Sequence, residues 1–214
     1  MAYFPLFVNL ANKQVLVVGG NSVSFRQIST FLAFEADIIL LADTLMPELE
    51  TLVSAYDFKI RHIKEEPSMQ SIESLDCNPT LVIAATQDPE LNSSIYDFYT
   101  RRNILVENIS NRAKCDFIFP AIIKRGDVVC GISSSGKSPL VSQFIKGLVE
   151  SSMPDKISEI NEHMDEIYKA VHQSVSDPAK RAMTMRAIFT RLIEDDNMTP
   201  DNEIDGIIGE AELL

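Results

Sequence analysis

The stretch Val15-Leu16-Val17-Val18-Gly19-Gly20-Asn21-Ser22-Val23-Ser24 decides the fold of this chain. An apolar run typical of a buried strand enters a tight glycine turn, and a helix is predicted to begin at once. In this layout the N–H groups at a helix N-terminus can receive a pyrophosphate. The usual fingerprint has glycine first and third and Gly or Ala sixth, where this chain has Gly19, Asn21 and Ser24. The stretch predicts the strand–turn–helix unit and leaves dinucleotide binding open.

Strand and helix patterns alternate outward from this stretch. Continuous apolar runs predict strands covered on both faces, and helical spacing or a proline in a first turn predicts helices. This alternation is typical of an α/β fold with a Rossmann-like, doubly wound parallel sheet. The segment 59–63 alternates apolar and charged residues, as an edge strand would. The predicted strands are 13–18, 37–41, 59–63, 80–86 and 104–106, and the predicted helices are 22–34, 47–56 and 89–102.

Two further parts are predicted after this sheet. The sheet is expected to end near residue 112, which gives a first domain over 1–112. Residues 117–124 and 128–132 have strand patterns and precede a helix over 140–151, so 113–150 is predicted to be a small α+β unit. Helical patterns over 156–174 and 178–193 predict a C-terminal helical domain over 151–214, which ends in an acidic tail.

Composition sets limits on the class of protein. Of the 214 residues, 45% are hydrophobic and 23% are charged, which is ordinary for a soluble globular chain. No apolar run approaches the roughly 18 residues that span a membrane, and the first residues do not resemble a signal peptide. Three widely spaced cysteines, Cys77, Cys115 and Cys130, favour free thiols in a reducing cytoplasm over a disulfide framework or a metal site.

The net charge of −12 is unevenly distributed. From Glu194 onward the chain has eight acidic residues and no Lys or Arg. A solvated tail is the simplest explanation of this run. Because no basic stripe offsets the negative charge, nucleic acid is not an expected partner.

Five segments stand in a fixed order along the chain: Tyr3-Phe4-Pro5-Leu6-Phe7, Val17-Val18-Gly19-Gly20, Ala84-Ala85-Thr86, Cys115-Asp116-Phe117-Ile118-Phe119-Pro120-Ala121 and Ile132-Ser133-Ser134-Ser135-Gly136-Lys137-Ser138-Pro139. Together they resemble the precorrin-2 dehydrogenase family, which forms the N-terminal part of siroheme synthases and includes some members that also insert iron. The resemblance covers about residues 1–150 and implies NAD-dependent oxidation of precorrin-2 to sirohydrochlorin. It also implies a homodimer built from a Rossmann domain, a dimerisation unit and a helical domain, with the tetrapyrrole in a cleft beside the nucleotide domain.

The resemblance implies a set of nucleotide-binding residues around the glycine turn. Asp43 and Thr44, just after the second predicted strand, match a pair that contacts the nucleotide in this family. Asp43 could equally cap the helix that follows it. The candidates for NAD binding are Gly19, Gly20, Asn21, Ser22, Val23, Asp43, Thr44 and Thr86.

Ser110 stands where the family has its proposed acid/base. That group is an aspartate seven residues before the first Phe of the Phe-Ile-Phe-Pro segment, and counting back from Phe117 gives Ser110. A serine does not act as a base near neutral pH without activation. Glu107, three residues earlier, is expected to face elsewhere. Two functions stay open: a dehydrogenase, or a catalytically degenerate relative that binds tetrapyrrole or a partner enzyme in a regulatory or channelling role. The same loss disfavours a third idea, a chelatase that no longer oxidises.

The serine-rich loop suggests substrate contacts. Ser134 matches a serine near the family's tetrapyrrole site, and Lys137, like Lys124 and Arg125, could pair with tetrapyrrole carboxylates. The run Gly131–Ser138 also satisfies the GxxxxGK[ST] pattern, but it lies outside the first strand–helix unit, so a phosphate-binding P-loop is not expected. The histidines are scattered without metal-ligand spacing, so no metal site is predicted; they are His62, His163 and His172.

Overall fold

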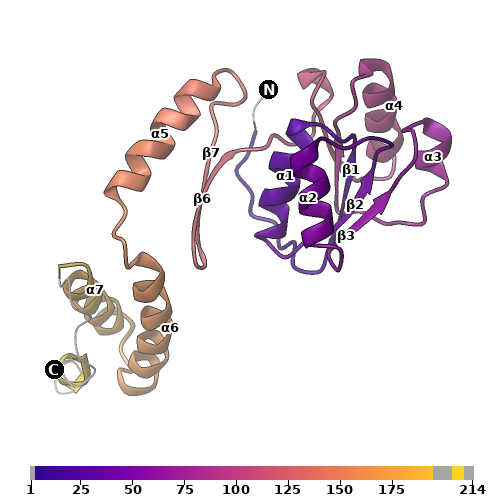
Figure 1. Ribbon diagram of the computed structural model, residues 1–214. Helices are drawn as coiled ribbons and strands as arrows, with labels where there is room; N and C mark the ends of the chain where they lie inside the picture. Colours follow the sequence, from indigo (N-terminus) through magenta and orange to yellow (C-terminus); the bar gives the residue numbers. More distant parts are fainter. Residues whose placement is uncertain (1–2, 195–203, 210–214) are drawn as a thin grey trace. The chain divides into compact units, whose positions relative to one another are not determined.

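The computed structural model describes residues 3–194 and 204–209 (Figure 1). The chain divides into two compact units, Met1–Phe119 and Pro120–Leu214. Most of the acidic tail lies outside the described residues. The division into domains at 112 and 150 stays a prediction.

The first unit contains a five-stranded parallel sheet. Its strand order is β3-β2-β1-β4-β5, with every neighbouring pair parallel, so the predicted doubly wound sheet is confirmed. The order reverses between β1 and β4, and ligands of such sheets bind at this switch point, outside the carboxyl ends of the strands. The strands are β1 Gln14–Val18, β2 Asp37–Leu41, β3 Ile60–Ile63, β4 Leu81–Ala84 and β5 Leu105–Asn108.

Helices cover both faces of this sheet (Figure 1). Helices α1 Ser22–Leu32 and α2 Pro47–Ala55 share one core cluster with the sheet, whereas α3 Met69–Glu73 and α4 Pro89–Thr100 share the other. Helix α3 was not predicted. It has only five residues, too few to show a helical period, and its start is fixed by a capping box with Ser68.

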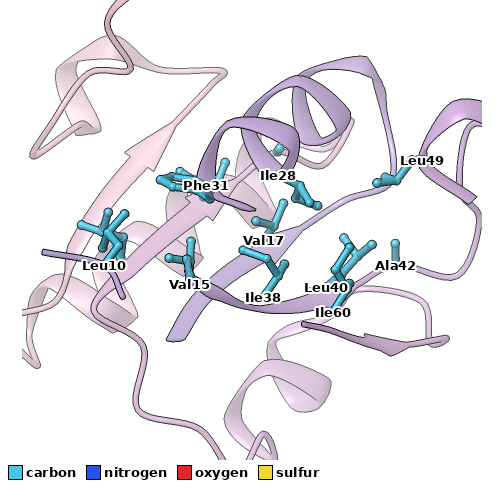
Figure 2. Packing of buried hydrophobic residues seen from close by; sticks show 14 residues of the cluster. Leu10, Val15, Val17, Ile28, Phe31, Ile38, Leu40, Ala42, Leu49 and Ile60 are labelled. Atoms are coloured by element: carbon cyan, nitrogen blue, oxygen red, sulfur yellow. The ribbon is translucent and has the colours of Figure 1, made fainter. Parts of the chain in front are cut away.

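Side chains of β1 alternate between the two core clusters. Val15 and Val17 pack with Ile28 of α1, as Figure 2 shows, while Leu16 and Val18 face the α3/α4 side. All five side chains are fully buried. Each contributes about 1.5–3 kcal/mol relative to exposure, which explains why a continuous apolar run forms this central strand.

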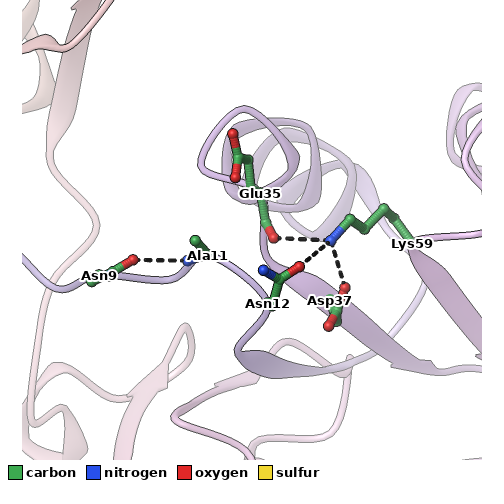
Figure 3. Close-up of polar contacts among 6 residues, drawn as sticks. All are labelled: Asn9, Ala11, Asn12, Glu35, Asp37 and Lys59. Carbon is green, nitrogen blue, oxygen red and sulfur yellow. Dashed lines mark hydrogen bonds and ion pairs between the residues drawn. The ribbon is translucent and has the colours of Figure 1, made fainter.

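Lys59 fixes the amino-terminal edge of the sheet (Figure 3). Its ammonium group forms a 2.8 Å ion pair with Asp37 and donates to Asn12 Oδ1 and to the backbone oxygen of Glu35, each at 3.2 Å. Asn12 and Glu35 both have positive φ, 56° and 60°, so Lys59 holds two tight turns together. These contacts occupy the amino-terminal ends of the strands. The candidate site lies at the opposite, carboxyl-terminal ends.

The segment after β5 covers the outer side of that strand. Val106 N donates to Asp116 Oδ2 at 3.0 Å, and Asp116 N donates to Val106 O at 2.9 Å. Next to this pair, Asn108 N donates to the sulfur of Cys115 at 3.2 Å. Because β5 pairs with β4 on its other side, both of its edges have hydrogen-bond partners.

The predicted strand over 117–124 is wrong in its first four residues. Phe117 and Phe119 pack against the α1/α2 core cluster, and the ring of Phe119 meets Phe31 edge to face with centroids 5.4 Å apart. Since these apolar side chains are needed by the first unit, the strand β6 begins only at Ala121.

The second unit is a hairpin followed by helices. Strands β6 Ala121–Arg125 and β7 Val128–Ile132 pair antiparallel, and α5 Pro139–Ser152, α6 Ile157–Ser174 and α7 Pro178–Glu194 follow, close to the predicted ranges. A short helix at 204–209, which was not predicted, packs Ile204 and Ile208 into a core with α6 and α7. Among the described residues no helix combines the length and apolar character needed to cross a membrane.

Candidate functional site

Three loops meet at the carboxyl edge of the first sheet. Gly19 has φ of 116°, and a Cβ there would collide with the backbone carbonyl of Ala85 in the loop after β4. A Cβ on Gly20 would collide with the backbone oxygen of Thr44 in the loop after β2. Both glycines are therefore required by the contact of the β1 loop with its two neighbours, whatever ligand the edge receives.

Asn21 caps α1. Its Oδ1 accepts hydrogen bonds from the backbone N–H groups of Val23 (3.0 Å) and Ser24 (3.2 Å), and its Nδ2 donates to Ala85 O at 2.7 Å. The residue has an extended conformation with φ of −99°, so the turn does not need a left-handed residue at this position. The N–H groups that a pyrophosphate would use are occupied by this side chain.

Asp43 and Thr44 are exposed just beyond β2. They line a cavity of about 570 Å³, to which His62 and Lys64 of the neighbouring strand end also contribute. The alternative that Asp43 caps the following helix is wrong, because Met46 is the N-cap of α2 and no side chain bonds to that end. Asp43 is thus available to a ligand, at the position where an acidic residue can bind ribose hydroxyls.

Asn92 of α4 organises the loop after β4. Its Oδ1 accepts from Thr86 N (3.0 Å) and Thr86 Oγ1 (2.8 Å), and its Nδ2 donates to Thr86 O (3.0 Å) and to Ser110 Oγ (2.6 Å). Asn92 is fully buried. It therefore positions two of the predicted site residues, Thr86 and Ser110, although nothing in the sequence analysis singled it out.

One signal could have drawn attention to Asn92. It lies three and seven residues before Ile95 and Tyr99, both buried on α4, so it occupies the apolar face of that helix. An amide on such a face is rarely buried without a set of hydrogen-bond partners.

Ser110 lies in the loop after β5, exposed to solvent. Its backbone N–H and that of Asn111 donate to Asn108 Oδ1, at 2.9 and 3.0 Å. Within the described residues, Asn92 is the hydrogen-bond partner of the Ser110 hydroxyl, and no carboxylate or imidazole bonds to it. Without a basic partner of this kind, a serine hydroxyl does not act as a base near neutral pH.

Glu107 faces away from Ser110, as expected. Its carboxylate accepts from Gln27 Nε2 of α1 at 2.6 Å and from Phe119 N at 3.0 Å. Burial raises the pKa of Glu107, and the hydrogen bonds from Phe119 and Gln27 and the nearby charge of Arg26 only partly offset this. Glu107 therefore joins α1, β5 and the segment after it.

The serine-rich loop of the second unit is held by its own hydroxyls. Ser134 Oγ donates to Ser138 O at 2.8 Å and accepts from Ser138 N at 3.0 Å. Ser138 caps α5, and Lys137 is exposed. The loop follows an antiparallel hairpin, whereas a P-loop follows a strand of a parallel sheet, so the resemblance to GxxxxGK[ST] has no structural counterpart.

Metal-ligating residues do not gather in the part of the chain that the structure describes: no group of three or more His, Cys, Asp or Glu side chains is arranged to hold an ion there. The three cysteines are free thiols.

Comparison with known proteins identifies the lineage of the first unit. Residues 6–121 match the model of a family described as "Putative NAD(P)-binding". The chain belongs to this family. The match covers the β1–α1 turn, the cavity beside Asp43 and the loop that carries Ser110.

The chain is also similar to siroheme synthases. The chain is 35% identical to the siroheme synthase of Blochmanniella floridana over 95% of its own length and 44% of that protein. It is 38% identical to the enzyme of Baumannia cicadellinicola, over 72% of this chain and 32% of that protein. The chain therefore spans less than half the length of these relatives. The predicted resemblance to the precorrin-2 dehydrogenase and siroheme synthase family is confirmed.

A solved structure described as "SirC, precorrin-2 dehydrogenase" has the same fold. The TM-score is 0.69, over 99% of this chain and 100% of that one, at 22% sequence identity.

Proposed function

We propose that this protein is an NAD-dependent precorrin-2 dehydrogenase of siroheme biosynthesis, which oxidises precorrin-2 to sirohydrochlorin. The observation that carries the proposal is the contact of the loops after β1, β2 and β4 around Gly19 and Gly20, at the carboxyl ends of the strands where the strand order reverses. Family membership and the names of the related proteins support it.

The residues at this edge fit most of a dinucleotide. Asp43 and Thr44 are exposed for the ribose hydroxyls, and Thr86 lies in the loop after β4, held by Asn92. At the pyrophosphate position, the N–H groups of Val23 and Ser24 can serve once the side chain of Asn21 moves away. A bound nicotinamide would accept a hydride from the tetrapyrrole, while this chain binds and orients both molecules.

The overall oxidation also releases one proton for each hydride. Ser110 cannot take it as a base, so in this proposal the proton passes to water, and the hydroxyl of Ser110 donates a hydrogen bond to the substrate. Ser134 and Lys137 are proposed to contact the tetrapyrrole, with Lys137 pairing with a carboxylate.

We propose a homodimer for this chain. Helix α5 exposes a row of apolar side chains four residues apart: Leu140 (82% exposed), Phe144 (68%) and Leu148 (52%). A row of this kind on one helix face is typical of an interface. Sedimentation should show a dimer for the wild type and a monomer for Phe144→Asp. A wild-type monomer at micromolar concentration would refute the dimer.

The test of the activity is direct. Purified protein is mixed with precorrin-2 and NAD⁺, and the absorbance of sirohydrochlorin and of NADH is followed, with a control that lacks NAD⁺. Equal amounts of both products are expected. No product despite tetrapyrrole binding would refute the dehydrogenase.

That outcome would favour the second candidate, a degenerate relative that binds tetrapyrrole or a partner enzyme. The observation in its favour is that the Ser110 hydroxyl is bonded to the neutral amide of Asn92 and to no acidic or basic group among the described residues.

A further inference from the structure

Asn21 joins two loops at the switch point of the sheet. Its Oδ1 is bonded to the start of α1, and its Nδ2 reaches the carbonyl of Ala85, 64 residues later in the chain, at 2.7 Å. The two ends of one carboxamide therefore join the loop after β1 to the loop after β4. These are the two loops between which a ligand of this sheet would enter.

We propose that the Asn21 side chain is a strap that closes the pyrophosphate position in the free protein, and that a dinucleotide binds only when this strap is released. The inference rests on the proposed binding of NAD. It makes Asn21 the residue that sets the affinity of this chain for pyrophosphate-containing nucleotides.

Competition for the same donors is the physical reason. The N–H groups of Val23 and Ser24 both donate to one oxygen, Asn21 Oδ1. They cannot donate to this oxygen and to a phosphate oxygen at the same time. The bond to Ala85 O adds a second interaction that must break. A ligand forms its phosphate contacts only after these three hydrogen bonds break. Its apparent affinity is therefore lower than for a site in which the N–H groups are already unoccupied.

Release of the strap is feasible because Asn21 is only half buried. Its carboxamide can turn toward solvent without exposing core side chains, and its neutral charge does not repel a phosphate. Glycine at this position would leave the N–H groups of Val23 and Ser24 without a side-chain acceptor. The fold should survive that substitution, since glycine is itself an accepted N-cap residue.

The experiment titrates wild type, Asn21→Gly and Asn21→Ser with three probes in a calorimeter: NAD⁺, ADP-ribose and adenosine. The first two carry a pyrophosphate and the third does not. Asn21→Gly should bind NAD⁺ and ADP-ribose about tenfold more tightly, a change of about 1.4 kcal/mol, and adenosine with unchanged affinity. Asn21→Ser keeps a capping oxygen but cannot reach Ala85, so its affinity for NAD⁺ should lie between those of wild type and Asn21→Gly.

Ser68→Gly is the matched control, because it removes a side-chain cap from α3 in the same unit. It should leave the affinity for NAD⁺ unchanged. Circular dichroism and thermal unfolding verify that every variant is folded.

Two results separate this inference from the proposed function. If wild type and Asn21→Gly bind NAD⁺ equally, or if adenosine affinity rises as much as NAD⁺ affinity, the strap is refuted while NAD binding stands. If no variant binds NAD⁺ at millimolar concentration, the proposed cofactor is refuted, and the proposal that Asn21 acts as a strap is refuted as well.

Discussion

The side-chain amide of Asn92 donates a 2.6 Å hydrogen bond to the hydroxyl oxygen of Ser110. This bond ties the loop after β5 to the first turn of α4, which also holds Thr86 in place. Because the Ser110 oxygen accepts from Asn92, the hydroxyl hydrogen can donate to a second group, such as a ligand.

Asn92→Ala should destabilise the first unit strongly. The substitution removes the acceptor of Thr86 N and the donor to Ser110, and it leaves a cavity at a fully buried site. The free energy of unfolding should fall by about 2–4 kcal/mol, measured by urea titration. Ser94→Ala, which removes one exposed hydroxyl bond on the same helix, should change it by less than about 0.5 kcal/mol. Equal effects of the two substitutions would refute the role of Asn92.

Ser110→Asp should raise the rate of sirohydrochlorin formation. The new carboxylate can accept from Asn92 and serve as a base, which typically contributes about 10²–10⁴-fold. Its rate should also acquire a dependence on the protonation of a carboxyl group. Ser110→Asn introduces a side chain of the same size as aspartate but without a titrating group, so its rate should equal that of wild type. A rate for Ser110→Asp no higher than for Ser110→Asn would show that the proton passes elsewhere.

Gly19→Ala should prevent stable folding of the first unit. The residue would need φ of 116° and its Cβ would strike the backbone of Ala85, which costs about 3 kcal/mol or more. Gly206 lies exposed in the helix over 204–209, and a Cβ there meets no atom within 4 Å. Gly206→Ala should therefore stabilise slightly, by up to about 1 kcal/mol. Thermal unfolding of both variants measures the contrast, and a small effect of Gly19→Ala would mean that the β1 and β4 loops separate easily.

Glu107→Gln should change how stability depends on pH. Burial raises the pKa of Glu107 above its ordinary value of 4.5, so the folded state binds the proton more tightly than the unfolded state does. The stabilisation from this proton is complete below the unfolded pKa and is lost as pH rises through the folded pKa. Glutamine resembles the neutral carboxyl and can still accept from Phe119 N.

The measurement is the difference in unfolding free energy between wild type and Glu107→Gln, from urea titrations at several pH values between 4 and 8. Wild type should lose stability relative to the variant as pH rises. A difference that is constant over this range would contradict the raised pKa.

The sheet could be predicted because its signals are local. Val15 to Val18 are apolar on both faces of a strand, and the glycines that follow show where the chain turns. The failures have equally physical causes. Phe117 and Phe119 have a strand-like pattern, but the core of the first unit recruits them, and α3 is too short for a periodicity to show.

The candidate site was predictable only in part. Gly19, Gly20 and Asp43 lie at strand ends, which the chain pattern locates. The hydrogen bonds that decide the chemistry are tertiary: Asn21 reaches Ala85 and Asn92 reaches Ser110, across 64 and 18 residues. No spacing in the sequence encodes such pairs, and the sequence therefore showed that Asn21 is unusual without showing what it does.

The short segment that follows β5 has a consequence for how this protein behaves at high concentration. A bare edge strand offers its N–H and C=O groups to any other strand and so invites aggregation. The carboxylate of Asp116 accepts from the backbone N–H of Val106, and the backbone N–H of Asp116 donates to the Val106 carbonyl. The hydroxyls of Tyr96 and Thr100 donate to the same carboxylate, at 3.1 and 3.2 Å. One aspartate therefore keeps the backbone of Val106 from pairing with another strand, and its loss would open this position to strand–strand association.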